Sequence, residues 1–283
     1  MKKILLTGST GFIGSEILNF LSKKNIIYII LRKKNKKFLK NNKVKVIYFK
    51  NYNQLNKELS KIKVNTVIHC ATHYIKDHKF EDIKKLSESN ILLGNIILEN
   101  LKKMQVKQFI NFSTVWENYN AQKRNYFNLY SAYKDCFNNI INFYKKHQKK
   151  TKFFTLVISD TFGHNDKRKK LINTLKINYK NNKTTQILSK NLFLNLLNVK
   201  DICDAVDLIL NKNIKPQTYV LKNKQTFSIY KIINSLNMMS EKKIKINWLS
   251  KKVVKEKIYN YKQLKKWHPI NSKIQDIIDS IRK

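Results

Sequence analysis

A tyrosine and a lysine spaced four residues apart, Tyr130 and Lys134, form the pair with the clearest capacity for acid/base chemistry. On a helix this spacing places both side chains on one face. A phenol has a reference pKa of about 10, so it exchanges protons poorly at neutral pH unless a neighbouring cation stabilises its phenolate. The Lys134 ammonium supplies such a cation. The pair is therefore predicted to donate or accept a proton at an oxygen atom of a substrate.

Two hydroxyl side chains, Ser113 and Thr114, stand at the end of an apolar run over residues 108–113 that is typical of a buried strand. Ligands of a parallel sheet bind at the carboxyl ends of its strands. We expect Thr114 to hydrogen-bond the substrate oxygen beside Tyr130, with Ser113 as a further substrate contact. The predicted catalytic residues are Thr114, Tyr130 and Lys134.

Three of the five glycines of the chain lie close together, as Gly8, Gly11 and Gly14. An apolar run over residues 3–6 precedes them and an amphipathic segment follows, which predicts a strand, a turn and a helix. A pyrophosphate approaches the backbone only where side chains are absent, and a helix N-terminus offers it free N–H groups. The segment is predicted to bind a dinucleotide through Gly8, Ser9, Thr10, Gly11, Phe12, Ile13 and Gly14.

The residues after the second predicted strand indicate which dinucleotide binds. An acidic side chain at this position holds the ribose hydroxyls of NAD, whereas a basic one suits the 2′-phosphate of NADP. Arg32 stands here and is one of only four arginines in a lysine-rich chain, and Lys33 follows it. We predict that both contact NADP, with NAD as the alternative cofactor.

Six apolar segments alternate with helical patterns, at 3–6, 26–31, 44–49, 66–71, 108–113 and 153–158. This alternation predicts the α/β class, with a Rossmann-type doubly wound parallel sheet. Beyond Gly163 the pattern loosens, which is typical of a smaller mixed α/β region that binds substrate. The predicted domains are 1–165 for the dinucleotide and 166–283 for the substrate, with residues 185–210 or so returning to the first domain.

The chain is strongly basic, with 58 Lys+Arg against 18 Asp+Glu and a formal net charge of +40. Such a surface attracts phosphate polymers in a salt-dependent way. However, recognition of bases and phosphates favours the arginine fork, and only four of the basic residues are arginine. The 36 Asn and four Ala fit drift in an AT-rich genome. We therefore expect no specific nucleic-acid partner, while a non-catalytic nucleic-acid-binding protein stays open as an alternative of another class.

Other features limit the compartment and the cofactors. The three cysteines, Cys70, Cys136 and Cys203, lie far apart, so no disulfide framework is expected and the cytoplasm is the expected location. No apolar run approaches the roughly 20 residues of a membrane span, so no membrane partner is expected. No set of His, Cys, Asp and Glu has metal-ligand spacing, so no metal site is predicted.

These features, in this order, resemble the extended short-chain dehydrogenase/reductases, the NAD(P)-dependent nucleotide-sugar epimerase/dehydratase family. The resemblance covers most of the chain and implies a nucleotide-sugar substrate and a homodimer formed through helices within 83–104 and 130–147. It implies further cofactor contacts from Cys70, Ala71, Thr72 and Asn90, beside Tyr130 and Lys134. We expect further substrate contacts from His73, Asp160 and Arg168.

The residues after Thr114 favour one branch of that family. Val115 and Trp116 stand where the 4,6-dehydratases carry Asp-Glu, and residues 113–119 and 160–168 most resemble the branch that contains CDP-abequose synthase. That branch implies NADPH-dependent reduction of the 4-keto group of a nucleotide-activated deoxyhexose for surface-polysaccharide synthesis. An NAD-dependent nucleotide-sugar 4-epimerase, using the same residues, is the alternative within the family.

Overall fold

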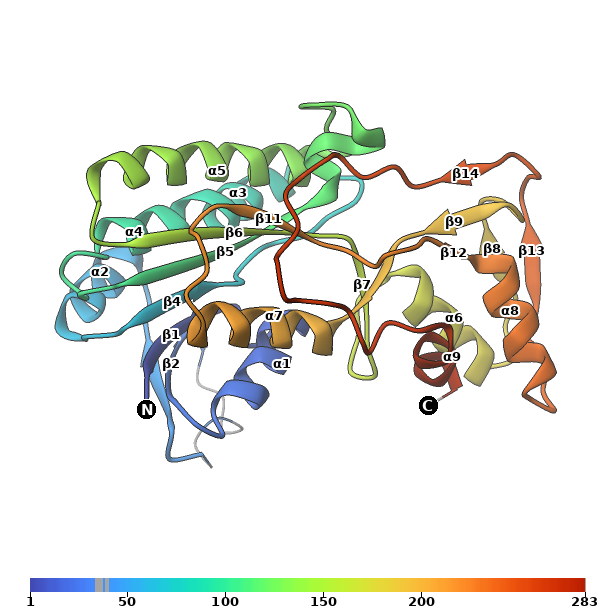
Figure 1. Ribbon diagram of the computed structural model, residues 1–283, viewed down its shortest axis with the longest axis horizontal. Coiled ribbons are helices and arrows are strands. Elements are labelled where there is room, and N and C mark those ends of the chain that lie inside the picture. The colour runs from blue at the N-terminus through green and yellow to red at the C-terminus, as the bar shows by residue number, and fades with distance from the viewer. Residues whose placement is uncertain (34–37, 39–40, 283) are drawn as a thin grey trace. The chain divides into compact units, whose positions relative to one another are not determined.

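The computed structural model describes residues 1–33, 38 and 41–282, and the chain forms two compact units (Figure 1). The first unit comprises Met1–Val157, Ile214–Tyr219 and Tyr259–Lys262. The second comprises Ile158–Asn213, Val220–Ile258 and the chain from Gln263 onward. The two units are defined by which residues pack together, whereas the predicted domains are defined by which ligand each is expected to bind. The boundary at 165 and the return of residues 185–210 therefore stay predictions.

A seven-stranded sheet has the order β11-β6-β5-β4-β1-β2-β3. Six of its strands lie where the apolar segments predict them, which confirms the Rossmann-type α/β class. The seventh, β11, is a four-residue strand between polar segments and was not predicted. The strands are β1 (Lys3–Thr7), β2 (Ile26–Leu31), β3 (Val44–Tyr48), β4 (Thr66–His69), β5 (Gln108–Thr114), β6 (Lys152–Ile158) and β11 (Thr218–Leu221).

The strand order reverses at β1, which pairs in parallel with both β2 and β4. Thr7, the last residue of β1, lies opposite His69, the last residue of β4. The connections that leave these two strands run in opposite directions along the sheet, so the two carboxyl ends flank a switch point of the kind where doubly wound sheets bind ligands. The Gly8 turn and the Cys70–Thr72 segment both start at this point.

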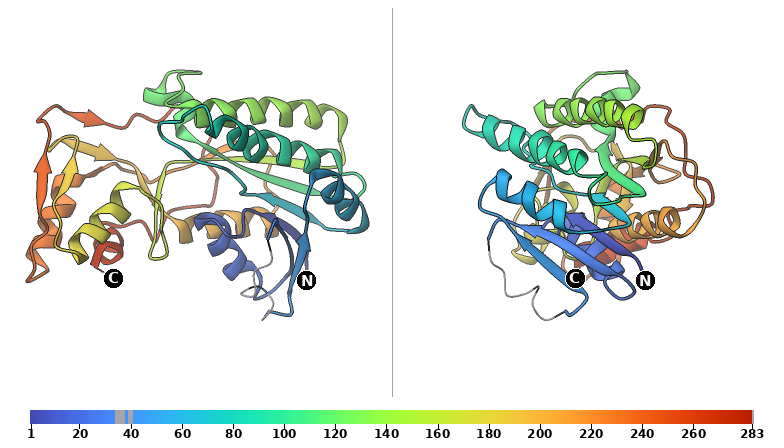
Figure 2. Two further views of the ribbon diagram at one scale, coloured as in Figure 1. Left: turned by 180° about the vertical axis from the view of Figure 1, so that it is seen from behind. Right: turned by 90° about the vertical axis from the view of Figure 1, so that its left-hand side faces the viewer.

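Helices cover both faces of the sheet. On one face α2 (Tyr52–Lys61), α4 (Leu93–Glu99) and α5 (Leu129–His147) pack through a buried apolar cluster that includes Leu55, Ile97, Phe137 and the strand residues Val67 and Phe109. On the opposite face lies α1 (Phe12–Leu21), as Figures 1 and 2 show. Successive strand residues point to opposite faces, so a sheet covered on both sides needs apolar residues throughout. This is why β1, β2 and β4 read as continuous apolar runs.

The helical pattern over residues 82–104 is interrupted in the structure. A π-helical turn, η2 (Glu88–Leu92), joins α3 (Asp82–Ser87) to α4, which ends at Glu99. A π turn takes one more residue than an α turn and shifts the phase of the helix that follows. Asn90 lies in this turn and is buried.

The second unit is built of short strands and helices, in agreement with the mixed α/β composition expected of it. In its small sheets β7 pairs with β10, β8 pairs with β13, and β9 lies between β12 and β14. An apolar cluster joins α6, α8 and α9 through buried residues such as Leu175, Ile232 and Ile278. The elements are β7 (Asp160–Phe162), α6 (Leu171–Lys180), β8 (Thr185–Ile187), β9 (Leu192–Leu194), β10 (Leu196–Asn198), α7 (Val199–Asn211), β12 (Phe227–Ser228), α8 (Ile229–Met238), β13 (Ile246–Trp248), β14 (Val254–Lys255) and α9 (Ile274–Arg282).

A buried carboxylate ties the last part of the chain to α7. Asp201 accepts hydrogen bonds from the backbone N–H groups of Ile270 and Asn271 at 3.0 and 2.9 Å, and from the hydroxyl of Ser272. The indole N–H of Trp267 donates to the Asp201 carbonyl at 2.8 Å. These bonds fix residues 267–272 within the second unit.

Two general features concern the described residues as a whole. None of the helices in the described ranges combines the length and apolar character that a bilayer span requires. Within the same ranges, His, Cys, Asp and Glu side chains form no group of three or more that could hold a metal ion.

Candidate active site

The turn after β1 depends on glycine at two positions. Gly8 has a φ of +70°, and a Cβ on it would come within 2.7 Å of the backbone nitrogen of Ala71, two residues after the end of β4. A Cβ on Gly14, in the first turn of α1, would overlap the Gly8 carbonyl. The backbone of the turn, of α1 and of the segment after β4 is therefore closely packed, and side chains are excluded from it.

The start of α1 suits an anionic group. Gly11, the N-cap residue, has no side chain to accept from the first helical N–H groups, and Phe12 and Ile13 supply N–H groups in the first turn. The Ser9 hydroxyl is buried and has no hydrogen-bond partner among the residues that the structure describes. Thr10 is exposed beside it. An unpartnered hydroxyl and open N–H groups at a helix N-terminus fit a dinucleotide pyrophosphate.

The segment after β4 is held from both sides. The Thr7 hydroxyl accepts from the Ala71 N–H at 3.0 Å and contacts Nδ1 of His69, also at 3.0 Å. On the other side Asn90 accepts from the Thr72 hydroxyl at 2.5 Å and from the His73 N–H at 3.1 Å. Its own Nδ2 donates to the His73 carbonyl at 3.1 Å.

These bonds indicate structural roles for Asn90 and His69. The Asn90 side chain clamps residues 72–73 to the π turn, and a contact with the cofactor stays a prediction for it. His69 is completely buried between Phe109 and Phe137, and burial lowers its pKa to about 3, with the Lys134 charge acting in the same direction. His69 is therefore a neutral core residue.

Arg32 follows β2 and its side chain is half exposed. Its Nη2 donates to the Tyr52 hydroxyl at 2.7 Å and lies 3.9 Å from a carboxylate oxygen of Glu88. The guanidinium also lies over the Phe49 and Tyr52 rings, at 6.0 and 5.8 Å from their centroids. Lys33 is exposed next to it. Arg32 is thus oriented by its neighbours while part of its guanidinium faces solvent.

The predicted acid/base pair lies in the first two turns of α5. A capping box between Asn128 and Ser131 starts the helix, so Tyr130 is its second residue and Lys134 lies one turn further on. The Tyr130 ring packs edge-on against Tyr74, with centroids 5.2 Å apart. Tyr74 in turn contacts Trp116 at 5.8 Å. The Tyr74 ring, with Trp116 packed behind it, therefore covers one side of the Tyr130 ring.

Lys134 is 3% exposed, although it carries an ammonium group. Burial lowers its pKa, while Glu117 and Cys70 act in the opposite sense. The ammonium makes no hydrogen bond or ion pair within 4.0 Å with any residue that the structure describes. A buried cation in this state has donors to offer to a bound ligand, which fits the ribose of a nicotinamide dinucleotide.

The two hydroxyls at the end of β5 are both buried. The Thr114 oxygen accepts from the Trp116 N–H at 3.3 Å and caps the short helix η3 (Val115–Ala121). The Ser113 oxygen accepts from Nδ2 of Asn138 at 3.0 Å. In both cases the hydroxyl uses an acceptor site, so its proton can be donated to a substrate oxygen.

Sequence reasoning missed two residues beside this set, Glu117 and Asn138. Nδ2 of Asn138 donates to both carboxylate oxygens of Glu117, at 3.2 and 3.1 Å. Asn138 lies four residues after Lys134, as Lys134 does after Tyr130. That repeated spacing, which places all three on one face of α5, is the signal that could have found it.

The predicted substrate residues Asp160 and Arg168 belong to the second unit. Arg168 donates to both carboxylate oxygens of Asp166, at 2.8 and 2.7 Å, and to the carbonyl and hydroxyl of Thr161. Asp160 forms an ion pair of 2.9 Å with Lys170. Their roles toward a substrate stay predictions, as do those of His73, Ser113 and Thr114 in the first unit.

The turn at β1, the switch point and the tyrosine–lysine pair are the features expected of a dinucleotide-binding enzyme of the Rossmann class. Residues 4–221 match the NAD dependent epimerase/dehydratase family, and the chain belongs to that family. Membership confirms the prediction of an NAD(P)-dependent enzyme, as against a non-catalytic protein.

Individual relatives agree with this assignment. CDP-abequose synthase from Yersinia pseudotuberculosis is 27% identical over 214 residues, which is 75% of this chain and 74% of that protein. CDP-abequose synthase from Salmonella muenchen is 23% identical over 219 residues, 77% and 73% of the two chains. The structure of UDP-glucuronic acid 4-epimerase from Bacillus cereus with NAD superposes with a TM-score of 0.82 at 20% identity, covering 99% of this chain and 98% of that one. At this identity the structural likeness shows the fold alone.

Proposed function

We propose that this enzyme uses NADPH to reduce the 4-keto group of a nucleotide-activated deoxyhexose. The observation that carries the proposal is the placement of Lys134, a buried ammonium without a direct protein partner in the described chain, one turn from Tyr130. The similarity to two proteins named CDP-abequose synthase supports the choice of substrate class. The anionic nucleotide diphosphate of such a substrate also suits the basic surface.

In this reaction each residue of the set has a defined task. NADPH supplies the hydride when bound. Tyr130 donates its phenolic proton to the keto oxygen, and the Thr114 hydroxyl orients that oxygen. Lys134 lowers the pKa of Tyr130 and holds the ribose of the cofactor. Ser113 and His73 contact the sugar, and substrate contacts by Asp160 and Arg168 remain predictions from the sequence.

A retained-cofactor 4-epimerase is the second candidate, and Glu88 is the observation in its favour. The Glu88 carboxylate lies 3.9 Å from Arg32, so an acidic group of the kind that accepts ribose hydroxyls stands beside the basic one. With Glu88 as the contact the enzyme would hold NAD, whereas with Arg32 it would hold NADP.

The test starts from the protein as purified. It is denatured and the released dinucleotide is assayed, and a fresh sample is titrated with NADPH and with NADH. The loaded enzyme is then given 4-keto-6-deoxyhexoses linked to CDP, UDP, dTDP or GDP while NADPH absorbance is followed. An empty protein that prefers NADPH and consumes it with one of these sugars supports the reductase. Near-stoichiometric NAD in the purified protein would overturn it in favour of the epimerase.

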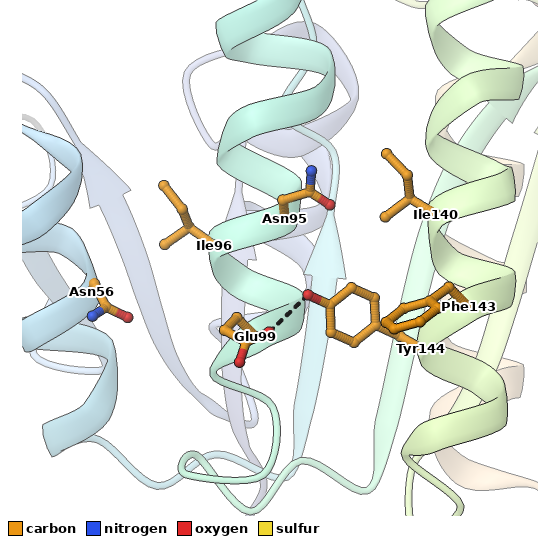
Figure 3. Close-up of a pocket in the computed structure, with 7 residues that line it drawn as sticks. All are labelled: Asn56, Asn95, Ile96, Glu99, Ile140, Phe143 and Tyr144. Atoms are coloured by element: carbon orange, nitrogen blue, oxygen red, sulfur yellow. Dashed lines mark hydrogen bonds between the residues drawn. The ribbon is translucent and has the colours of Figure 1, made fainter.

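We also propose a homodimer formed through α4 and α5. A surface hollow between α2, α4 and α5 is lined in part by apolar side chains, of which Phe143 is 57% exposed (Figure 3). The Tyr144 hydroxyl donates to Glu99 across it at 2.8 Å. The hollow is lined by Asn56, Asn95, Ile96, Glu99, Ile140, Phe143 and Tyr144. Light scattering at moderate salt should give twice the 33.7 kDa chain mass, and Phe143→Lys should give the monomer.

A further inference from the structure

Arg32 shares its guanidinium with a carboxylate from another part of the first unit. Glu88, the first residue of η2, places a carboxylate oxygen 3.9 Å from Nη2 of Arg32. The Arg32 side chain is 50% exposed and the Glu88 side chain 30%, so a ligand from solvent has access to both. Within the described ranges, Glu88 is the one carboxylate within 4.0 Å of this guanidinium. The predicted cofactor residue therefore stands in a site that carries both signs of charge.

The guanidinium is oriented by the start of α2. The same Nη2 donates to the Tyr52 hydroxyl at 2.7 Å, and the guanidinium lies over the rings of Phe49 and Tyr52. Burial raises the pKa of the Tyr52 hydroxyl, Arg32 acts to lower it and Glu88 acts to raise it. The three polar side chains thus form one cluster, in which a hydroxyl and a carboxylate approach the same nitrogen of Arg32.

The π turn explains how Glu88 reaches this cluster. Residues two apart do not share a face of a helical turn. Asn90, two residues after Glu88, is buried and hydrogen-bonds residues 72–73. Glu88 points elsewhere, toward Arg32 at the end of β2. The turn that clamps the segment after β4 therefore also brings a carboxylate to the residue that follows β2.

The two charges favour different dinucleotides. In a sheet of this kind the adenosine ribose lies beside the residue that follows β2. The ribose 2′-hydroxyl of NAD can donate a hydrogen bond to a carboxylate, whereas the 2′-phosphate of NADP is anionic and is repelled by it. A guanidinium instead binds the phosphate through charge-assisted hydrogen bonds. Glu88 therefore favours NAD at the place where Arg32 favours NADP.

We propose that Glu88 is a specificity-determining residue of the cofactor site, whose carboxylate lowers the preference that Arg32 confers for NADP over NAD. The inference rests on the proposed function for the placement of the adenosine ribose beside Arg32. Both side chains act at the same time, so the choice of dinucleotide depends on the balance of two opposite charges and not on Arg32 alone.

The test measures dinucleotide binding in the absence of any sugar. Retained dinucleotide is first removed, and the dissociation constants for NADP⁺ and NAD⁺ are measured by isothermal titration calorimetry. In Glu88→Gln, which keeps the shape of the side chain and removes its charge, the affinity for NADP⁺ should rise roughly threefold to tenfold. The affinity for NAD⁺ should not rise. A side chain that only supported the fold would weaken the binding of both dinucleotides when replaced.

Glu58→Gln is the matched control. Glu58 lies on α2, the helix that begins at Tyr52, and it pairs with Lys61 at 2.7 Å. The control removes one negative charge from the same unit, away from Arg32, and it should change both dissociation constants by less than about twofold. If thermal unfolding shows that Glu88→Gln is not folded, Glu88→Ala takes its place with the same expected result. An affinity ratio for the two dinucleotides that equals the wild-type ratio overturns the proposal.

Two fragments separate this inference from the proposed function. Adenosine 2′,5′-bisphosphate and 5′-AMP differ only in the 2′-phosphate and contain no nicotinamide. Glu88→Gln should raise the affinity for the bisphosphate relative to 5′-AMP, as it does for the dinucleotides. If this shift is found but the wild type retains NAD and reduces no nucleotide-linked 4-ketosugar, the proposed function fails while the inference holds. If a sugar is reduced with NADPH and Glu88→Gln leaves both ratios unchanged, the inference fails while the proposed function holds.

Discussion

The ring of Tyr74 stands edge-on to the ring of Tyr130, with centroids 5.2 Å apart and an interplanar angle of 89°. Tyr74 comes from the segment after β4 and Tyr130 from the first turn of α5. The segment that starts at the dinucleotide switch point therefore also sets the position of the predicted acid.

This contact predicts a positioning effect for Tyr74. In Tyr74→Leu the Tyr130 ring loses its edge contact, which is worth about 0.5–1.5 kcal/mol, so kcat should fall by roughly twofold to thirteenfold. Cofactor affinity, measured by fluorescence titration, should be unchanged. A Tyr74→Phe variant keeps the ring and serves as the control, and it should retain wild-type turnover.

Tyr130→Phe should lower kcat by roughly 10²–10⁴-fold, because it removes the proton that the keto oxygen receives. The dissociation constant for NADPH should stay close to that of the wild type. Tyr133→Phe on the same helix is a suitable comparison, since Tyr133 pairs with the Ser87 hydroxyl at 2.7 Å and lacks a lysine four residues on. Near-normal turnover in Tyr130→Phe would remove Tyr130 from the catalytic set.

Substitutions in the glycine turn should differ in severity. Gly14→Ala places a Cβ over the Gly8 carbonyl and should abolish dinucleotide binding, because the turn must open to admit it. Gly11→Ala brings its Cβ to 3.3 Å from the same oxygen and should weaken binding less. Isothermal titration calorimetry with NADPH and NADH measures the dinucleotide affinity of each variant, and thermal unfolding checks that each variant is folded. Equal losses in the two variants would contradict a role for this close approach.

Arg32→Ala should reduce the affinity for NADPH tenfold or more and leave the affinity for NADH nearly unchanged, because only the former carries a 2′-phosphate. Lys33→Ala, at the exposed residue next to it, should have a smaller effect. If Arg32→Ala lowers the affinity for both dinucleotides equally, Arg32 supports the site through its hydrogen bond to Tyr52 and does not contact the 2′-phosphate.

The buried His69 predicts a loss of stability in acid. Its folded pKa is about 3, below the ordinary value of 6.5, so the unfolded chain binds the proton first. The free energy of unfolding should fall as the pH drops from about 6.5 toward 3, by at most about 1.4 kcal/mol per pH unit from this residue. Urea unfolding at a series of pH values should show a flatter dependence in His69→Gln. If the free energy of unfolding depends on pH equally in the wild type and in His69→Gln, groups other than His69 cause the loss of stability in acid.

The sequence was most informative where a structure needs one residue type. Glycine at 8 and 14, continuous apolar runs in β1 and β2, and the Tyr130–Lys134 spacing each follow from a local requirement, and family and fold were predicted from them. Glu117 could not be found in this way, because it stands in a polar stretch that reads as a solvated loop. Its burial is produced by Asn138, 21 residues away, and by the segment around Tyr261, and no local pattern encodes that packing. Asn90 is predicted by the family resemblance and not by a local pattern, because its inward position depends on the π turn.

The sheet has one consequence for how the chain is made. Strand β6 ends at Ile158, but its neighbour β11 begins at Thr218, after 59 intervening residues. During synthesis from the N-terminus, β6 is an open edge with unpaired N–H and C=O groups until residues 218–221 have left the ribosome. The nascent first unit is therefore a candidate for chaperone binding at that edge, and a ribosome stalled before residue 218 should present a protein whose sheet still lacks its last strand.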